Sequence, residues 1–146
     1  MLIRKFTIKL EVFFSELKIW ITNENFNTVA SKFLGAKLNE VGQHCSALMF
    51  YTGEDCKNEH KGKYFIFIKD EEDYIEFIGQ LSHEILHFVN SIFEEKGIYY
   101  NNMEDEVLAY THGYLLESAL KMIRAREEKF FKNHGDTIKY FPHLYR

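Results

Sequence analysis

The sequence is poor in the residues that cross-link or interrupt a chain. Its 146 residues include two cysteines, Cys45 and Cys56, and one proline, Pro142. Two thiols are too few for the disulfide framework of a small secreted domain, so we expect a reducing, cytoplasmic setting. No repeat, linker or low-complexity tract divides the chain, and we expect one domain over residues 1–146.

Long apolar runs and blocks of a single charge are also missing. No run reaches the roughly 18 apolar residues that span a bilayer, and no apolar signal-peptide core follows Arg4 and Lys5. Lys and Arg number 18 and Asp and Glu 22, for a net charge of −4. Without a basic block, a nucleic acid finds little to bind. We therefore expect neither a membrane nor a nucleic acid as a partner.

The first half of the chain has the patterns of a small sheet. Alternating apolar residues predict a strand over residues 3–12, and aromatic and β-branched residues predict strands over 46–51 and 64–69. Apolar residues three and four apart predict a short helix over 24–34. The polar connection 53–62 is expected to be mobile.

The second half has the patterns of two long helices. One is predicted over residues 71–96 with Gly97 as its stop, and the other from a cap at Asn101 or Asn102 to residue 132. The predicted fold class is therefore α+β, with a small N-terminal sheet and a short helix followed by two long helices.

The first long helix contains the pattern H-E-x-x-H at His83, Glu84 and His87. Histidines four residues apart lie on one helix face and can present two ring nitrogens to one cation. Neutral imidazoles suit zinc, and a third protein ligand leaves one zinc position open for water. Glu84, about 100° round the helix, is placed to take a proton from that water.

The same residues also fit the polar side of an ordinary amphipathic helix. An apolar stripe runs along this helix, and His83 and His87 point away from it. The stripe consists of Ile75, Ile78, Leu81, Ile85, Leu86, Val89, Ile92 and Phe93. Because short motifs also occur by chance, the motif alone leaves both interpretations open.

A third ligand is available on the second long helix. Glu106 falls in its opening turns, and two helices joined by a short loop pack antiparallel. At about 1.5 Å per residue, His87 is roughly 15 Å from the end of its helix, which the loop and the next turn can cover. Gly113, on the same face as Glu106, would allow the helices to approach closely.

Other residues near Glu106 offer alternatives. Glu104 and Asp105 are acidic candidates for the third ligand. Asp105 lies on the apolar side of its helix, as does His112, and these two could instead satisfy each other in the core.

The pattern of His83, Glu84 and His87 followed by Glu106 resembles the gluzincin branch of zincin metallopeptidases, which includes thermolysin. In that family a glutamate on the next helix completes the zinc site. Residues 105–113 are similar in spacing to the family's glutamate helix, and the chain also resembles small phage-related metallopeptidases. The resemblance covers about residues 64–120 and implies a minimal zincin-like fold with an active-site helix and a glutamate-bearing helix.

The resemblance implies a zinc-dependent peptidase. His83, His87 and Glu106 would bind zinc, and Glu84 would activate a metal-bound water for attack on a peptide carbonyl. The strand over residues 64–69 would be an edge strand that pairs with an extended peptide substrate. The alternative function is a non-catalytic interaction or regulatory module on a zincin-like scaffold.

One position departs from the family's pattern. Thermolysin-like enzymes carry an aspartate four residues after the ligand glutamate, where it supports a zinc-bound histidine, and this chain has Tyr110. A tyrosine hydroxyl could accept that histidine's N–H, by a weaker neutral bond, or stabilise the oxyanion. Cleavage specificity is not implied by the resemblance.

Overall fold

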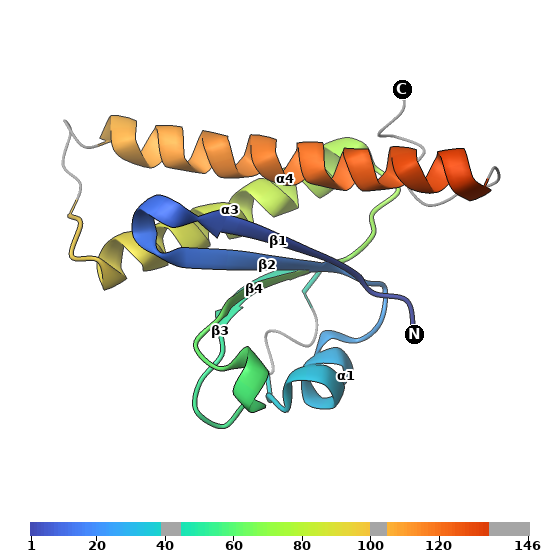
Figure 1. Cartoon of the computed structure of the whole chain (residues 1–146), viewed down its shortest axis with the longest axis horizontal. Coiled ribbons are helices and arrows are strands. Elements are labelled where there is room, and N and C mark those ends of the chain that lie inside the picture. Colours follow the sequence, from blue (N-terminus) through green and yellow to red (C-terminus); the bar gives the residue numbers. More distant parts are fainter. Residues whose placement is uncertain (39–44, 100–104, 135–146) are drawn as a thin grey trace.

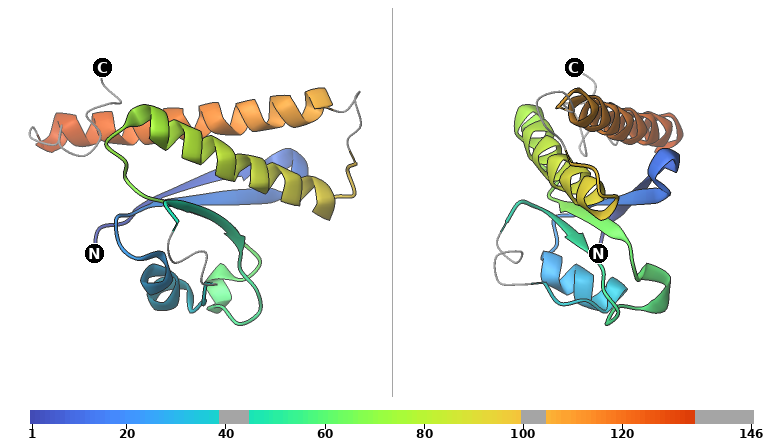
Figure 2. Two further views of the ribbon diagram at one scale, coloured as in Figure 1. Left: turned by 180° about the vertical axis from the view of Figure 1, so that it is seen from behind. Right: turned by 90° about the vertical axis from the view of Figure 1, so that its left-hand side faces the viewer.

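The computed structural model describes residues 1–38, 45–99 and 105–134, with the side chains of residues 105 and 129–134 excepted. A four-stranded sheet has helices on both faces (Figures 1 and 2), which confirms the α+β class. The main elements are β1 (Arg4–Leu10), β2 (Ser15–Ile21), α1 (Phe26–Val29) with a π-helical turn (Ala30–Leu34), β3 (Ala47–Tyr51), β4 (Tyr64–Ile68), α3 (Tyr74–Glu95) and α4 (Asp105–His134). Short 3-10 turns cover Glu11–Phe13 and Asn58–His60.

The strand order is β1-β2-β4-β3. β1 and β2 form an antiparallel hairpin, β2 and β4 are parallel, and β4 and β3 are antiparallel. β4 is thus paired on both sides, and all five of its residues are buried. The expectation that the strand before the motif helix is an edge strand is therefore wrong: the edge strands are β1 and β3, and β3 is the one that pairs with β4.

β2 was not expected from the sequence. Its alternate residues Leu17, Ile19 and Ile21 are completely or almost completely buried, while Glu16 and Lys18 form an ion pair on the other face. The strand pairs with β1 in a tight hairpin and places a second strand beside β4. A strand of period two was therefore present in the sequence, directly after the first one.

The sheet lies between two helical layers. α3 and α4 pack on one face, and α1 with its π-helical turn packs on the other, as the right-hand view of Figure 2 shows. The α3 and α4 side contains the larger core, built on Ile19, Ile66 and Phe88 among others. The opposite core surrounds Trp20 and Phe67. Both faces of the sheet are thus covered, as the apolar β4 requires.

α3 begins and ends where its sequence signals lie. The Asp73 side chain accepts hydrogen bonds from the N–H groups of Ile75 and Glu76, and Gly97 follows the helix in the left-handed conformation with φ of 69°. The helix starts at Tyr74, three residues later than the predicted start at residue 71. Asp70, at the end of the preceding strand, contacts Arg4 instead.

The buried face of α3 is turned from the predicted stripe. Ile75 is 81% exposed and Leu86 is 40% exposed, whereas Phe77, Glu84 and Phe88 are buried. α3 packs against β3 and β4 as well as α4, so the sheet covers more of the helix surface than the apolar stripe alone. This rotation brings Glu84 into the packed layer.

The other sequence expectations have mixed outcomes. The apolar side of α4 faces the core, with Leu115, Ala119 and Ile123 buried. The expected cap of that helix, Asn101 or Asn102, lies outside the described residues. In the connection 53–62, Cys56 is buried and the Lys57 N–H donates to the carbonyl oxygen of Leu34 at 2.8 Å. Within the described ranges, no helix is long and apolar enough to cross a membrane.

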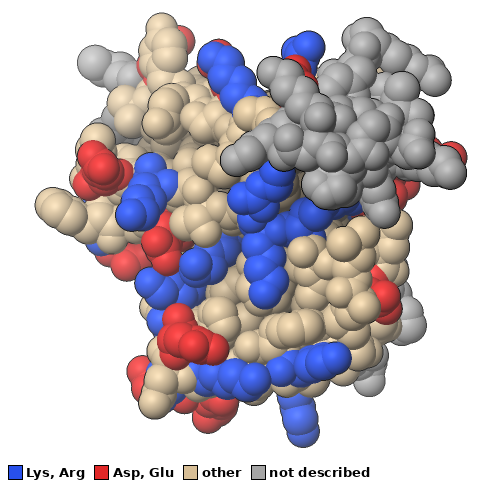
Figure 3. Space-filling view, turned by 45° about the vertical axis from the view of Figure 1, so that its right-hand side comes forward, with Lys and Arg blue, Asp and Glu red and all other residues tan. Residues whose placement is uncertain are grey.

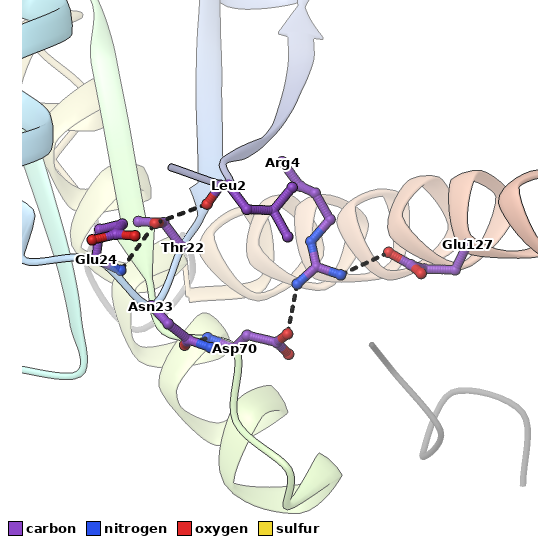
Figure 4. A network of polar contacts seen from close by, with 7 residues as sticks. All are labelled: Leu2, Arg4, Thr22, Asn23, Glu24, Asp70 and Glu127. Carbon is purple, nitrogen blue, oxygen red and sulfur yellow. Dashed lines mark hydrogen bonds and ion pairs between the residues drawn. The ribbon is translucent and has the colours of Figure 1, made fainter. Parts of the chain in front are cut away.

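Arg4 ties three elements together (Figure 4). From the start of β1 its guanidinium contacts Asp70, which precedes α3, at 2.6 Å and Glu127 of α4 at 3.0 Å. The Glu127 side chain is only 4% exposed. Burial raises the pKa of Glu127, and the attraction of Arg4 partly offsets this rise. The cation therefore allows a carboxylate to lie in the packed layer between the sheet and α4.

Replacing Arg4 by alanine is expected to destabilise the fold by about 2–3 kcal/mol near pH 7, because Glu127 loses its buried counter-ion. Without the cation the pKa of Glu127 rises further, so the loss of stability shrinks as protonation neutralises this carboxylate at lower pH. Urea unfolding at pH 7 and pH 5 measures both effects. Glu127→Gln, which removes the buried charge, should cost less at pH 7, and a loss for Arg4→Ala that grows on acidification contradicts the account.

Candidate metal site and catalytic base

The two histidines of the motif face each other across one turn of α3. Their Nε2 atoms are 3.0 Å apart, and both side chains are exposed. Two nitrogens that bind one tetrahedral zinc ion at about 2.0–2.1 Å are about 3.3 Å apart. The pair therefore fits two corners of a zinc site, and its spacing follows from the helix alone because the residues are four apart.

Glu84 points to a different place from the histidines. It is 8% exposed, and its Oε2 atom accepts a hydrogen bond of 2.8 Å from the backbone N–H of Met49 in β3. The Lys69 N–H donates to the carbonyl of Ser46, and the Thr52 N–H donates to the carbonyl of Lys63. The even-numbered residues along β3 therefore bond to β4. The N–H of Met49 consequently points away from β4, toward the open edge of the sheet.

A buried carboxylate is costly to an amphipathic helix. Removing a charge from water is unfavourable unless its partners compensate, and an apolar side chain at position 84 would serve packing better. Charged groups held in such positions are frequent in functional sites. The interpretation of this face as an ordinary solvated one accounts for His83 and His87, which are exposed, but does not account for Glu84.

Cys45 is electrostatically coupled to Glu84. Burial raises the pKa of the Cys45 thiol, and the negative charge of Glu84 adds to the rise. Cys45 thus stays a neutral thiol near neutral pH and adds no second negative charge beside Glu84.

Glu106 shares a surface hollow with one of the two histidines, His83. With His83 and Ala109 it lines a hollow of about 400 Å³ between α3 and α4. In the described ranges, no three His, Cys, Asp or Glu side chains lie close enough to hold a metal ion. The structure therefore brings Glu106 and His83 to one hollow without closing a three-residue site. The alternative ligands, Glu104 and the side chain of Asp105, lie outside the described parts of the chain.

Tyr110 and Gly113 do not have the positions expected of them. Tyr110 is 75% exposed and lines a separate hollow with Phe13 and Tyr114, next to the β1–β2 hairpin. The structure thus does not bring its hydroxyl to His83 or His87. A Cβ atom on Gly113 would meet no atom within 4 Å, so this glycine does not serve close packing of the two helices.

Two contacts of the site were not expected from the sequence. One is the backbone N–H of Met49, for which the only signal was that a strand over residues 46–51 was predicted. The other joins α4 to α3: His112 Nε2 lies 3.0 Å from the carbonyl oxygen of Ser82 and 3.2 Å from its Oγ. The apolar side of α4 indicated that His112 would be inside, and His112 is half-buried; the side chain of its expected partner, Asp105, lies outside the described parts.

Basic side chains gather on another part of the surface. Figure 3 shows a band of Lys and Arg on the face that carries the start of β1 and α1. Some lysines of the described chain lie over aromatic rings: Lys5 Nζ is 4.3 Å from the Trp20 ring centre, and Lys32 Nζ is 5.5 Å from that of Phe33. The absence of a nucleic-acid partner stays a prediction.

A zinc titration tests the histidine pair. We predict binding of one equivalent of zinc, and a loss of affinity of about 100-fold or more in His83→Ala and in His87→Ala, since each removes a direct ligand. His60→Ala is the matched control, because His60 packs near Trp20, with ring centres 6.2 Å apart, on the opposite side of the sheet. Calorimetry gives the affinities. Equal binding by all three variants would exclude the pair as ligands.

Comparisons with known proteins leave the site to be judged on its own geometry. No protein-family model, curated protein or solved structure matches this chain.

Proposed function

We propose that this protein is a zinc-dependent hydrolase, most simply a peptidase, with His83, His87 and Glu106 as zinc ligands and Glu84 as general base. The observation that carries the proposal is the place of Glu84. Its carboxylate is buried one residue from His83, and it bonds to the edge strand at which an extended substrate would pair.

The chemistry divides between the metal and the chain. Zinc would supply a Lewis acid that polarises a carbonyl and makes water more acidic. Glu84 would accept the proton of the attacking water and then donate it to the leaving amine. The Met49 N–H engages Oε2 and holds the carboxylate in one orientation, which leaves Oε1 for the proton.

The edge of β3 supports a peptide as the substrate. The backbone groups of Ala47 and Tyr51 and the carbonyl of Met49 alternate with those bonded to β4 and so point outward, while the outward N–H of Met49 is bonded to Glu84. A groove of about 680 Å³ follows the strand from Leu48 to Gly53, with residues 35–38 on its other wall. An extended peptide beside β3 would therefore place its backbone next to the strand that holds Glu84.

The second candidate function is a non-catalytic interaction or regulatory module. It is favoured because, among the described residues, Glu106 does not form with the two histidines a group of three side chains close enough to hold one metal ion. Such a module would bind zinc without turnover, or bind no zinc and keep its fold. The proposal also includes a cytoplasmic setting, which the free thiols of Cys45 and Cys56 support.

Glu84→Gln separates catalysis from metal binding. The amide keeps an oxygen to accept the Met49 N–H but cannot take a proton, so hydrolysis of a peptide library should fall by about 100-fold or more while zinc binding persists. Unfolding of the metal-free variant should show equal or slightly higher stability, since a buried charge is removed.

Glu94→Gln, on an exposed part of the same helix, is the matched control for hydrolysis and should retain wild-type turnover. Full turnover in Glu84→Gln would remove the proposed base. Zinc binding without turnover in the wild-type protein itself would favour the interaction module.

The third ligand is tested by comparing Glu106→Ala with Asp105→Ala. Glu106→Ala should weaken zinc binding by about 10-fold or more because the ion loses its one carboxylate, while Asp105→Ala should leave the affinity unchanged. Competition with a coloured chelator measures both constants. The reverse pattern would assign the ligand to Asp105.

A further inference from the structure

The segment of α4 from Glu106 to Tyr114 has little apolar anchorage. From Glu106 to Tyr114, no described side chain is fully buried, and the first fully buried residue of the helix is Leu115. Leu108 is partly buried and packs against the main core. Packing alone therefore leaves this segment of α4 weakly fixed on α3.

A polar contact joins this segment of α4 to α3, next to the histidine motif. His112 Nε2 is 3.0 Å from the carbonyl oxygen of Ser82, the residue before His83. A carbonyl oxygen can only accept, so Nε2 carries the hydrogen and the imidazole is the donor. The Ser82 hydroxyl, 3.2 Å from the same nitrogen, lies beside this bond. The bond is directional, so it fixes position along and around the helix more sharply than an apolar contact does.

We propose that His112 is a positioning residue, which sets the place of Glu106 relative to the histidine pair through its bond to Ser82; the inference rests on the proposed zinc site. His83 and His87 are spaced by their own helix. Glu106 stands on the other helix, so its distance from them depends on how α4 lies on α3.

The position of the His112–Ser82 bond explains how it can affect the position of Glu106. Ser82, His83, Glu106 and His112 line the same hollow between the helices. Glu106 precedes His112 by six residues, which is about 9 Å along the helix axis. A shift or tilt of α4 at His112 therefore moves the Glu106 carboxylate directly, because the segment between them is one rigid helix.

The bond can be removed without leaving a buried group unsatisfied. As part of α3, the Ser82 carbonyl also accepts the helical N–H four residues later. Loss of the imidazole donor thus costs the fold little, and its effect should appear in the zinc site.

The test compares His112→Leu with His112→Gln. Leucine fills the space without a donor, whereas the glutamine amide can place an N–H near the position of Nε2. Loss of one net hydrogen bond predicts about 3- to 10-fold weaker zinc binding for His112→Leu, with His112→Gln within about twofold of wild type. Chelator competition gives the affinities, and urea unfolding of the metal-free proteins shows that both variants are folded.

A double-mutant cycle separates positioning from general damage. His112→Leu should weaken zinc binding in the wild-type background but not in a Glu106→Ala background, where no carboxylate remains to be placed. Equal weakening in both backgrounds, or none in either, overturns the inference. The visible spectrum of cobalt-loaded His112→Gln should match that of wild type; a changed spectrum would make His112 a ligand and also overturn the positioning role.

The proposed zinc site and the positioning role of His112 can be tested separately. If the wild-type protein binds no zinc, the metal site itself is wrong, and the inference falls with it. If the wild-type protein binds zinc through Glu106 and His112→Leu binds it equally well, only the positioning role is lost.

Discussion

The burial of the Glu84 carboxylate against the edge of β3 is the constraint on which the site depends. α3 must lie with this ion in the layer between helix and sheet, and the Met49 N–H is its partner there. With the helix in this rotation, His83 and His87 emerge at the surface beside the hollow that Glu106 lines. One helix thus has a packed face that carries the proposed base and an exposed face that carries the two proposed histidine ligands.

The parts of the site differ in how far they are fixed by local structure. The spacing of the histidine nitrogens and the order of Glu84 between them follow from helical geometry. The approach of Glu106 depends on the packing of two helices, in a segment with one partly buried leucine and one bond from His112 to Ser82. A site assembled in this way is expected to close fully when a cation draws the carboxylate inward, so binding would itself complete the arrangement.

Predictability from the sequence follows the same division. The α+β class, β1, β3, β4 and α3 could be predicted because each has a local pattern of two or 3.6 residues and a recognisable stop such as Gly97. β2 was missed although Leu17, Ile19 and Ile21 alternate, since it follows the first strand after a very short turn. The central position of β4 could not be predicted, because strand order is a property of long-range pairing.

The errors at the site have the same physical origin. Tyr110 and Gly113 share one face of α4 with Glu106, and we expected this face to meet α3. The rotation of α4 against α3 instead places Tyr110 beside the β1–β2 hairpin and Gly113 next to open space. Likewise, Ile75 and Leu86 belong to the apolar stripe yet are exposed, because the sheet and α4 together decide which arc of α3 is covered. A helical wheel gives the angles between side chains, whereas the neighbours of the helix give the direction of the buried face.

Zinc K-edge X-ray absorption on the protein loaded with one equivalent of zinc tests the central claim most directly. The account predicts a spectrum with two imidazole ligands near 2.0 Å and the remaining donors oxygen, as expected for two histidines, a glutamate and solvent. A spectrum without imidazole scattering, or a protein that retains no zinc at all, would contradict it.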